Sequence, residues 1–255
     1  LNIILNGCNG RMGQVLTRMI AAGENMQVVA GIDATGEVKS DYPVFKSAED
    51  CDIKADVIID FSHYTAVPNL EPEPTHTCRH AAKIKTPIVV ATTALDDECF
   101  AMLNQASKEI PVFRSANMSI GINALAKAIS AITPVLEEKF NVEIIEKHHT
   151  AKLDSPSGTA ILLADKVSAA CKEKKNYLYG RHGKDDKFEM TDLGIHAVRG
   201  GTIPGEHTVI YAGPDEVIEL KHTAYSREIF ANGAIAAAKF LIQQENGLYS
   251  MDDMF

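Results

Sequence analysis

A cluster of positive charge lies between an apolar run and a helix-start signal in the second half of the chain. The run at 142–147 leads into His148 and His149, and Lys152 follows. Imidazole titrates near neutral pH, so a histidine here can donate or accept a proton, and a lysine stabilises negative charge as it develops. The segment therefore predicts a site for proton transfer to a small anionic substrate.

The residues after Lys152 indicate where the carboxylates of such a substrate would bind. We expect Ser155 to cap a helix and Pro156 to occupy its first position. The amides of residues 157–159 would then face outward at the positive end of the helix, which suits a carboxylate. In a chain with a net charge of -9, this local positive charge favours a dianionic substrate.

Three other interpretations of these residues stay open. Paired histidines can bind a metal, although adjacent residues at a strand end point in opposite directions and no third ligand is evident. The histidines can be core or surface residues without chemistry, and Lys152 alone can be a solvated surface charge. We expect no metal site here. The histidines and cysteine of 76–80 resemble a metal cluster, but we interpret them as a polar surface segment.

A glycine-rich segment near the N-terminus has the spacing of a dinucleotide-binding turn. Gly7, Gly10 and Gly13 form a GxxGxxG pattern between an apolar run and an amphipathic one. Glycines allow a tight turn and a close approach to a pyrophosphate, which the helix N-terminus also favours. Asp33 ends the next apolar run, where a carboxylate can accept both adenosine-ribose hydroxyls. The pattern predicts a nicotinamide dinucleotide cofactor.

Asp33 also bears on the choice between the two nicotinamide cofactors. Its carboxylate repels the extra phosphate of NADP, and residues 34–36 supply no cation to bind that phosphate. Lys39 is the nearest candidate cation. We expect NADH to be preferred, with NADPH as the alternative.

Alternating apolar and amphipathic segments indicate how the glycine-rich turn is held. We expect buried strands at 3–5, 28–32, 57–60, 88–91 and 112–113, with helices at 15–22 and 97–108 between them. This alternation predicts an α/β fold with a Rossmann-type doubly wound parallel sheet, whose ligands bind beyond the carboxyl ends of the strands. Two loops at these ends, 91–93 and 115–118, are expected to contact the nicotinamide and its ribose. Glu71–Pro74 would break the helix expected between residues 60 and 88.

The pattern changes after about residue 120. We expect a long helix at 123–140 that Pro134 kinks or interrupts, a helix at 159–173, and strands at 142–147, 195–199, 207–211 and 217–223. Strands with few crossovers predict a second α+β domain with a mixed or antiparallel sheet. An alanine-rich helix at 229–243 could pack back on the first domain. The expected domains are therefore 1–119 with 230–255, and 120–229.

Length and composition exclude several classes of protein. A chain of 255 residues suits two domains, and no apolar run approaches the roughly 18 residues of a membrane helix. The net charge of -9 argues against a nucleic-acid partner, which needs a basic surface. The first residues lack the pattern of a signal peptide, and the five scattered cysteines favour free thiols in a reducing compartment. We expect a cytoplasmic protein that does not act at a membrane.

Taken together, these segments resemble the dihydrodipicolinate reductase family, also called 4-hydroxy-tetrahydrodipicolinate reductases, over nearly the whole chain. Residues 7–13 match its GxxGRMG motif, and residues 143–160 match its E-x-x-E-x-H-H-x-x-K-x-D-x-P-S-G-T-A signature. Residues 198–208 and 230–234 also fit. Two segments depart from the family pattern: Ala91-Thr92-Thr93-Ala94 stands where GTTG is usual, and the stretch 65–79 is irregular.

The resemblance implies NAD(P)H-dependent reduction of 4-hydroxy-tetrahydrodipicolinate to tetrahydrodipicolinate in diaminopimelate and lysine biosynthesis. It implies a homotetramer built through the sheet of the second domain, which would serve substrate binding and oligomerisation. His148 would be the general acid/base and Lys152 a proton donor near the ring nitrogen. The substrate carboxylates would be held by His149, Gly158 and Thr159. The cofactor would be surrounded by Gly7, Cys8, Asn9, Gly10, Arg11, Met12, Asp33, Ala91, Thr92, Thr93, Ser115, Ala116, Asn117 and Met118.

Two alternatives remain at this point. The chain could be another two-domain dehydrogenase acting on an amino or imino acid, which a substrate screen would distinguish. It could also be a nucleotide sensor that has lost catalysis, which would bind the cofactor without turnover. The intact His148, His149 and Lys152 argue against the sensor.

Overall fold

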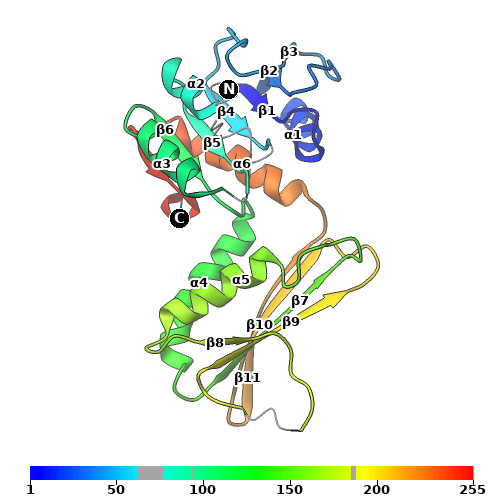
Figure 1. The fold of residues 1–255 in the computed structure, drawn as a ribbon, viewed down its shortest axis with the longest axis vertical. Helices are drawn as coiled ribbons and strands as arrows, with labels where there is room; N and C mark the ends of the chain where they lie inside the picture. Colours follow the sequence, from blue (N-terminus) through cyan, green and yellow to red (C-terminus); the bar gives the residue numbers. More distant parts are fainter. Residues whose placement is uncertain (63–76, 94, 185–187, 255) are drawn as a thin grey trace. The chain divides into compact units, whose positions relative to one another are not determined.

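The chain folds into two compact units. The computed structural model describes residues 1–62, 77–93, 95–184 and 188–254. Leu1–Ser119 and Arg227–Phe255 form the first unit, and Ile120–Ser226 form the second. Each unit has its own sheet and its own hydrophobic core (Figure 1).

The first unit is built on a seven-stranded sheet. Its spatial order is β12-β6-β5-β4-β1-β2-β3, and every pair of neighbours is parallel. The strands are β1 (Asn2–Asn6), β2 (Gln27–Ile32), β3 (Val44–Phe45), β4 (Val57–Asp60), β5 (Ile88–Val90), β6 (Pro111–Arg114) and β12 (Gly247–Tyr249). The predicted parallel sheet is confirmed. The short edge strands β3 and β12 carry too few residues for a periodicity signal.

Helices cover both faces of this sheet (Figure 1). On one face pack α1 (Arg11–Ala22), α6 (Glu228–Leu241) and the 3-10 helix η2 (Met251–Met254). On the other face pack α2 (Thr77–Lys83) and α3 (Asp97–Ala106). The return of α6 to the first unit confirms the expectation for the alanine-rich C-terminal helix. The fold is therefore doubly wound, and its ligand edge lies at the carboxyl ends of the strands.

The segment around α2 corrects one prediction. Thr77, Cys78 and His80 are buried, not part of a polar surface. In a helix, Cys78 and Ala81 fall on the same face, and that face packs against the sheet. Burial lowers the pKa of His80. Glu71–Pro74 lies outside the described residues, and so does His76.

The second unit has a mixed five-stranded sheet with the order β11-β10-β7-β9-β8. Its strands are β7 (Asn141–His148), β8 (Asn176–Leu178), β9 (Asp192–Arg199), β10 (Gly205–Gly213) and β11 (Glu216–Ala224). β7 runs parallel to β9 and antiparallel to β10. The prediction of a mixed or antiparallel sheet is thus confirmed as a mixed one.

Two helices, α4 (Ile120–Leu136) and α5 (Gly158–Ala170), pack together over one face of this sheet (Figure 1). The helix α4 starts and ends earlier than expected, and it continues through Pro134 to Leu136. Pro134 has no amide proton, so it removes one helical hydrogen bond, and the helix ends two residues later.

The strand β7 positions the predicted chemistry. Its side chains alternate, so Val142, Ile144, Glu146 and His148 are buried on the face that carries the helices. Val142 and Ile144 join the core beneath α4 and α5. Further along the strand, the same buried face carries a carboxylate and an imidazole. Polar groups without water must be paired, so the end of β7 requires partners from neighbouring elements.

Within the described residues, no helix is both long and apolar enough to cross a bilayer. All five cysteines are described and none forms a disulfide, which agrees with the expectation of free thiols.

Candidate active site

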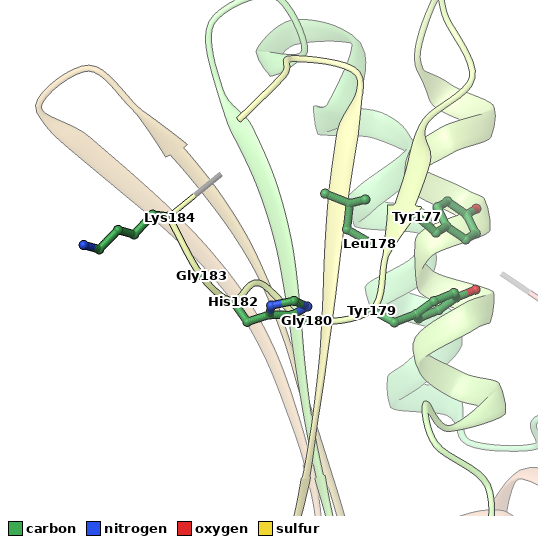
Figure 2. Close-up of a pocket in the computed structure, with 7 residues that line it drawn as sticks. All are labelled: Tyr177, Leu178, Tyr179, Gly180, His182, Gly183 and Lys184. Atoms are coloured by element: carbon green, nitrogen blue, oxygen red, sulfur yellow. The ribbon is translucent and has the colours of Figure 1, made fainter. Parts of the chain in front are cut away.

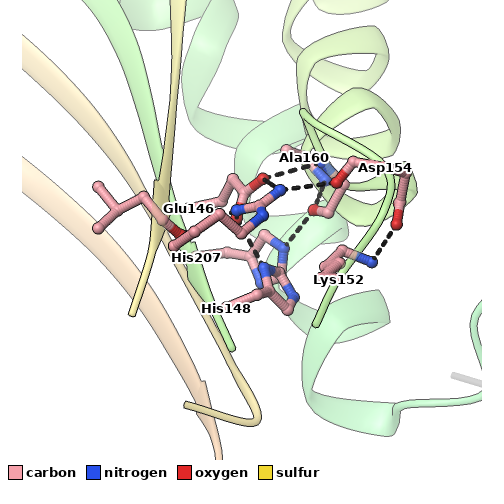
Figure 3. Close-up of polar contacts among 9 residues, drawn as sticks. Glu146, His148, Lys152, Asp154, Ala160 and His207 are labelled. Atoms are coloured by element: carbon pink, nitrogen blue, oxygen red, sulfur yellow. Dashed lines mark hydrogen bonds and ion pairs between the residues drawn. The ribbon is translucent and has the colours of Figure 1, made fainter. Parts of the chain in front are cut away.

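The buried end of β7 holds a carboxylate–imidazole pair. Glu146 is fully buried, and its Oε2 lies 2.6 Å from Nδ1 of His148 (Figure 3). A carboxylate only accepts hydrogen bonds, so Nδ1 carries the proton. Nε2 is then the nitrogen left to exchange a proton with another molecule. Gly205 lies beside it, and a Cβ at that position would come within 3.0 Å of Nε2.

Arg199, the last residue of β9, balances the charge of Glu146. Its two terminal nitrogens reach the two carboxylate oxygens, each at 2.8 Å, in a bidentate pair. The amide of Ser157 donates a further hydrogen bond to Glu146 at 3.0 Å. Burial raises the pKa of Glu146, but hydrogen bonds from Arg199, His148 and Ser157 outweigh it and hold the pKa below its usual value. Glu146 is therefore a fixed anion against His148.

A second histidine packs on the first. The ring centroids of His148 and His207 are 5.1 Å apart and the rings meet edge to face. Nε2 of His207 shares a hydrogen bond of 2.9 Å with the hydroxyl of Ser157. Burial, with the neighbouring His148, lowers the pKa of His207 to about 4. Because His207 stays neutral at neutral pH, it adds no positive charge to repel a protonated His148.

Ser157 begins the helix α5 and corrects the predicted cap. Its side chain accepts a hydrogen bond from the amide of Ala160 at 3.1 Å, so Ser157 is the N-cap and Gly158 the first helical residue. Ser155 and Pro156, which were expected in these roles, precede the helix. The prediction of the cap was wrong because Ser155, Ser157 and Thr159 can each cap a helix and all lie within five residues of one another. The hydroxyl of Ser157 is the one that meets both the helix amide and His207.

The helix start leaves room for a ligand on one side. Gly158 is exposed, and a Cβ built on it would meet no atom within 4 Å. Thr159 and His149 are partly exposed. The first amides of a helix carry its positive end and lack helical partners. An anion can therefore reach the N-terminus of α5.

Lys152 lies on the loop between β7 and α5. Its ammonium pairs with Asp154 at 2.8 Å, and its side chain is 21% exposed (Figure 3). Burial raises the pKa of Asp154, but hydrogen bonds from Lys152 and the Gly158 amide hold it below its usual value. The ammonium of Lys152 is thus already paired with a carboxylate of its own loop.

The glycine-rich turn in the first unit has the geometry that its spacing predicts. Gly7 adopts a positive φ of 76°, and a Cβ there would lie 2.8 Å from the carbonyl oxygen of Phe61. A Cβ at Gly13 would lie 2.2 Å from the carbonyl oxygen of Gly7. The helix α1 starts after Gly10, so its first amides open at the carboxyl edge of β1. The backbone therefore makes a cradle that fits a pyrophosphate.

The side chains of two predicted cofactor residues are almost completely buried. Cys8 and Met118 are buried, at 0% and 2% exposure. Burial, with nearby Asp33, raises the pKa of the Cys8 thiol to about 11, so it stays neutral. Gly10 and Arg11 are exposed, while Asn9 and Met12 are partly exposed. The side chains of the turn that a ligand could meet are therefore those of Asn9, Arg11 and Met12.

Asp33 lies directly beside this turn. Its carboxylate accepts hydrogen bonds from the amide of Asn9 at 3.3 Å and from the amide and hydroxyl of Thr35. Burial raises its pKa, but bonds from Thr35 and Asn9 outweigh it and keep the pKa below the usual value. Ala34 is exposed, and Lys39 pairs with Glu37 at 2.9 Å. Asp33 is therefore an ionised acceptor next to the glycine-rich turn.

The two other predicted cofactor loops follow β5 and β6. Thr92 is buried and Thr93 is exposed, while Ala94 lies outside the described residues. In the second loop, Ser115 bonds to the backbone of Asn117, and Ala116 is exposed. Both loops lie at the same edge of the sheet as the glycine-rich turn, since all these strands are parallel. The structure brings the predicted cofactor residues together at one edge.

Two surface cavities lie apart from the predicted site residues. One, of about 440 Å³, is lined by residues 177–180 and 182–184, at the end of β8 and in the segment after it (Figure 2). The other, of about 590 Å³, lies between α2 and α3. Neither is lined by a residue of the sites predicted from the sequence. Within the described residues no group of three potential metal ligands occurs either.

Sequence reasoning missed the residues that support the predicted ones. Glu146, Arg199 and His207 lie around His148. The sequence motifs contain these three residues, but the sequence assigned no role to them. The alternation of β7 carries the signal, since Glu146 and His148 stand two positions apart on one buried face. Arg199 and His207 lie on other strands, and only the sheet brings them together.

The first unit has a parallel sheet with a glycine-rich turn and an acidic residue beside it. The second carries a carboxylate-supported histidine and a lysine. Together they define a two-domain oxidoreductase that uses a pyridine nucleotide.

Comparison with known proteins identifies the family. Residues 1–118 match the family model described as dihydrodipicolinate reductase, N-terminus, and residues 121–255 match dihydrodipicolinate reductase, C-terminus. The chain belongs to the dihydrodipicolinate reductase family. It is 48% identical to the 4-hydroxy-tetrahydrodipicolinate reductase of Caldanaerobacter subterraneus subsp. tengcongensis, over 100% of this chain and 98% of the relative. It is 43% identical to the enzyme of the same name from Clostridium novyi, over 99% and 97%.

Solved structures show the same fold. A dipicolinate-bound dihydrodipicolinate reductase from Paenisporosarcina sp. TG-14 aligns with a TM-score of 0.80 at 22% identity, over 100% of this chain and 99% of that one. A diaminopimelate (DAP) dehydrogenase from C. glutamicum in complex with DAP aligns with a TM-score of 0.57 at 14% identity, over 98% and 92%. At these identities the likeness concerns the fold alone.

Proposed function

We propose that the chain reduces 4-hydroxy-tetrahydrodipicolinate to tetrahydrodipicolinate with a nicotinamide nucleotide, in diaminopimelate and lysine biosynthesis; the substrate loses its hydroxyl as water, and a hydride and a proton are added. The observation that carries the proposal is the cluster of Glu146, His148 and Arg199 beside the open N-terminus of α5. It combines a proton-exchanging group with a place for carboxylates, which the reduction of a cyclic dicarboxylate requires.

The nucleotide would be held by the first unit. The cradle of Gly7, Gly10 and Gly13 fits a pyrophosphate, and Asp33 fits the adenosine ribose. The loops 91–93 and 115–118 would contact the nicotinamide end. When bound, the reduced nicotinamide supplies the hydride for the reaction.

His148 would exchange the proton that the reduction requires. Because Glu146 holds Nδ1, the protonated ring can donate its proton from Nε2 and become neutral without rotating. Glu146 stabilises the charged ring. Arg199 keeps Glu146 paired when His148 is neutral, so the buried carboxylate is never left alone. The Glu146–Arg199 pair therefore supports both protonation states of the ring.

Lys152 and the helix N-terminus would bind the two carboxylates of the substrate. Lys152 already pairs with Asp154 at 2.8 Å, and the amide of Gly158 also stabilises that carboxylate. Substrate carboxylates would find the same donors, together with His149 and Thr159. Lys152 would also stabilise or protonate the ring nitrogen as negative charge develops on it.

We propose NADH as the preferred cofactor. Asp33 is ionised and next to the turn, and the following residue, Ala34, has no cationic side chain. Lys39 is engaged by Glu37. An additional phosphate would meet a carboxylate here without a cation dedicated to it.

We also propose a homotetramer assembled through the second sheet, in a cytoplasmic enzyme. The helices α4 and α5 cover one face of this sheet. The opposite face carries Ile145 and Ile210 from the central strands and Val217, which is 59% exposed. Sedimentation equilibrium would give four times the mass of the chain, and a monomer at all concentrations would contradict the proposal.

The proposed function is tested by absorbance at 340 nm, with the substrate generated in situ by the preceding synthase. NADH and NADPH are compared at equal concentrations. We expect substrate-dependent oxidation that is faster with NADH. A protein that binds NADH but oxidises neither cofactor would contradict the reductase and favour a sensor.

A further inference from the structure

A buried carboxylate in the first unit has no part in the proposed chemistry. Asp60 is the last residue of β4 and is 0% exposed. β4 lies between β5 and β1, and Asp60 pairs in register with Asn6 on one side and Val90 on the other. In the sheet, β2 and β3 lie on one side of β1, whereas β4, β5 and β6 lie on its other side. Asp60 therefore lies at the switch point of the strand order, where ligands of this fold bind.

Among the residues that the structure describes, four hydrogen bonds hold Asp60, and all four come from uncharged donors. Oδ2 accepts from the side-chain amide of Asn6 at 2.9 Å. Oδ1 accepts from the amide of Ser62 at 2.8 Å, from its hydroxyl at 2.6 Å and from the hydroxyl of Thr92 at 3.0 Å. Within the described residues, no cation lies within ion-pair distance of Asp60. A buried anion without a counter-charge is costly unless these bonds persist.

The bonds of Asp60 connect three loops at the carboxyl edge. Asn6 passes the connection to the glycine-rich turn, because its Oδ1 accepts from the amide of Gly7 at 3.1 Å. Thr92 belongs to the loop after β5, and its hydroxyl also lies 3.0 Å from the carbonyl oxygen of Ser62. The loop after β4 therefore joins the turn to the loop after β5 through one carboxylate.

The backbone at this point leaves little freedom. A Cβ on Gly7 would lie 2.8 Å from the carbonyl oxygen of Phe61 and 2.9 Å from the amide nitrogen of Ser62. The side-chain amide of Asn6 also donates to the hydroxyl of Thr77, at the start of α2, at 2.6 Å. Movement of one loop would therefore break bonds in the others.

We propose that Asp60 is a positioning residue that couples the two ends of the cofactor site, the pyrophosphate cradle and the loop facing the nicotinamide. This inference rests on the proposed function, since it takes those loops as the cofactor site. Asp60 fixes both loops in one arrangement before the nucleotide binds. Neither loop then has to be ordered when the nucleotide binds. Contacts at both ends of the nucleotide therefore contribute fully to its affinity.

The variant Asp60→Asn tests the coupling. An amide keeps the shape of the carboxylate but has only one oxygen. Its NH₂ group, which cannot accept a hydrogen bond, must therefore face either Asn6 or the three donors that now bond to Oδ1. The dissociation constants of NADH and of ADP-ribose, which lacks the nicotinamide, are measured by calorimetry well below the unfolding temperature. We expect Asp60→Asn to raise the dissociation constant of NADH about tenfold. We also expect it to reduce the ratio of NADH affinity to ADP-ribose affinity.

Two further variants complete the test. Asp56→Asn is the matched control, because Asp56 accepts from the amide of Asn2 near the amino end of the same strand and is exposed; its NADH affinity is expected to stay within about twofold of the wild type. If Asp60→Asn does not fold, Thr92→Val removes one donor with little change of shape and is expected to weaken NADH about threefold.

The outcomes separate the inference from the proposed function. A variant with a lower unfolding temperature but an unchanged ratio of NADH to ADP-ribose affinity would make Asp60 merely structural and overturn the coupling. A wild-type protein that fails to bind NADH would instead overturn the cofactor assignment. A protein that binds NADH, and in which Asp60→Asn weakens NADH binding more than ADP-ribose binding, supports the coupling, whatever its turnover.

Discussion

Two fully buried carboxylates, Asp60 in the first unit and Glu146 in the second, are held in different ways. Asp60 accepts hydrogen bonds from Asn6, Ser62 and Thr92, none of which carries a charge. Glu146 faces the guanidinium of Arg199 and the imidazole of His148. Neutral donors fix the orientation of a carboxylate but do not balance its charge. A guanidinium, or an imidazole that carries a proton, does both.

This difference matches the work proposed for each unit. In this proposal the first unit binds the nucleotide at the glycine-rich turn, and its carboxylate orders the loops. The second unit would transfer a proton, and its carboxylate would stabilise the ring that carries the proton. The comparison therefore predicts that variants of one unit leave the function of the other intact.

The largest expected effect is the loss of turnover in His148→Gln and Lys152→Met. Each removes a group that would meet the reacting substrate, so we expect kcat to fall about 1,000-fold. The NADH dissociation constant is expected to stay unchanged, since both residues belong to the second unit. Stopped-flow turnover and NADH fluorescence give the two quantities.

Matched controls for these variants are His182→Gln and Lys172→Met. His182 is exposed, and Lys172 forms an exposed pair with Glu138. Both should keep nearly the wild-type kcat. A loss of NADH affinity in His148→Gln or Lys152→Met would break the proposed division between the units.

The next largest effect is on stability, in Arg199→Met. This change leaves Glu146 buried without its cation, and we expect the free energy of unfolding to fall by about 4 kcal/mol. Arg18→Met is the control, because Arg18 pairs with Glu228 on the surface and its loss should cost less than about 1 kcal/mol. Urea unfolding measures both. Equal losses would show that the charge of Glu146 needs no dedicated partner.

His207 makes stability depend on pH. Its pKa is lowered to about 4 by burial, so the folded state disfavours the proton that the unfolded state accepts below about pH 6.5. This group therefore does not reduce stability above pH 6.5. As the pH falls from 6.5 to 4, we expect its titration to lower the free energy of unfolding by about 3 kcal/mol.

The variant His207→Gln tests that window. Glutamine can still bond to Ser157 but does not titrate, so the stability of the variant should change less between pH 6.5 and 4. Thermal unfolding across this range gives the slopes of the variant and the wild type. Parallel slopes would mean that His207 is not held neutral by the fold.

The smallest expected effect concerns cofactor choice. Ala34→Arg places a cation next to Asp33, and we expect kcat/KM with NADPH to rise about tenfold while that with NADH changes little. The ratio of the two values is compared with that of the wild type. A wild type that already prefers NADPH would contradict the interpretation of Asp33.

The sequence was most informative where the backbone alone decides the structure. The glycine spacing and apolar runs predicted the parallel sheet, the turn at Gly7 and the placement of Asp33 at its edge. Geometry of this kind follows from short segments, because glycine and strand patterns act locally. The roles of the individual residues in binding and catalysis remain predictions.

The sequence was least informative about side chains that meet from separate elements. Arg199 reaches Glu146 from β9, and His207 packs on His148 from β10. Thr92 reaches Asp60 from the loop after β5. Such contacts depend on strand order and register, which no local pattern encodes. The error at the cap of α5 has a related cause, since the contact with His207 favours Ser157 over Ser155.

The most direct test of the account is Glu146→Gln, measured as kcat across pH together with the dissociation constant of NADH. Glutamine keeps the shape but removes the charge that stabilises a protonated His148. The account predicts a kcat about 100-fold lower, an alkaline limb of the pH profile moved to lower pH, and unchanged NADH binding. An unchanged pH profile with nearly normal kcat would contradict it, because Glu146 would then have no effect on the proton that His148 transfers.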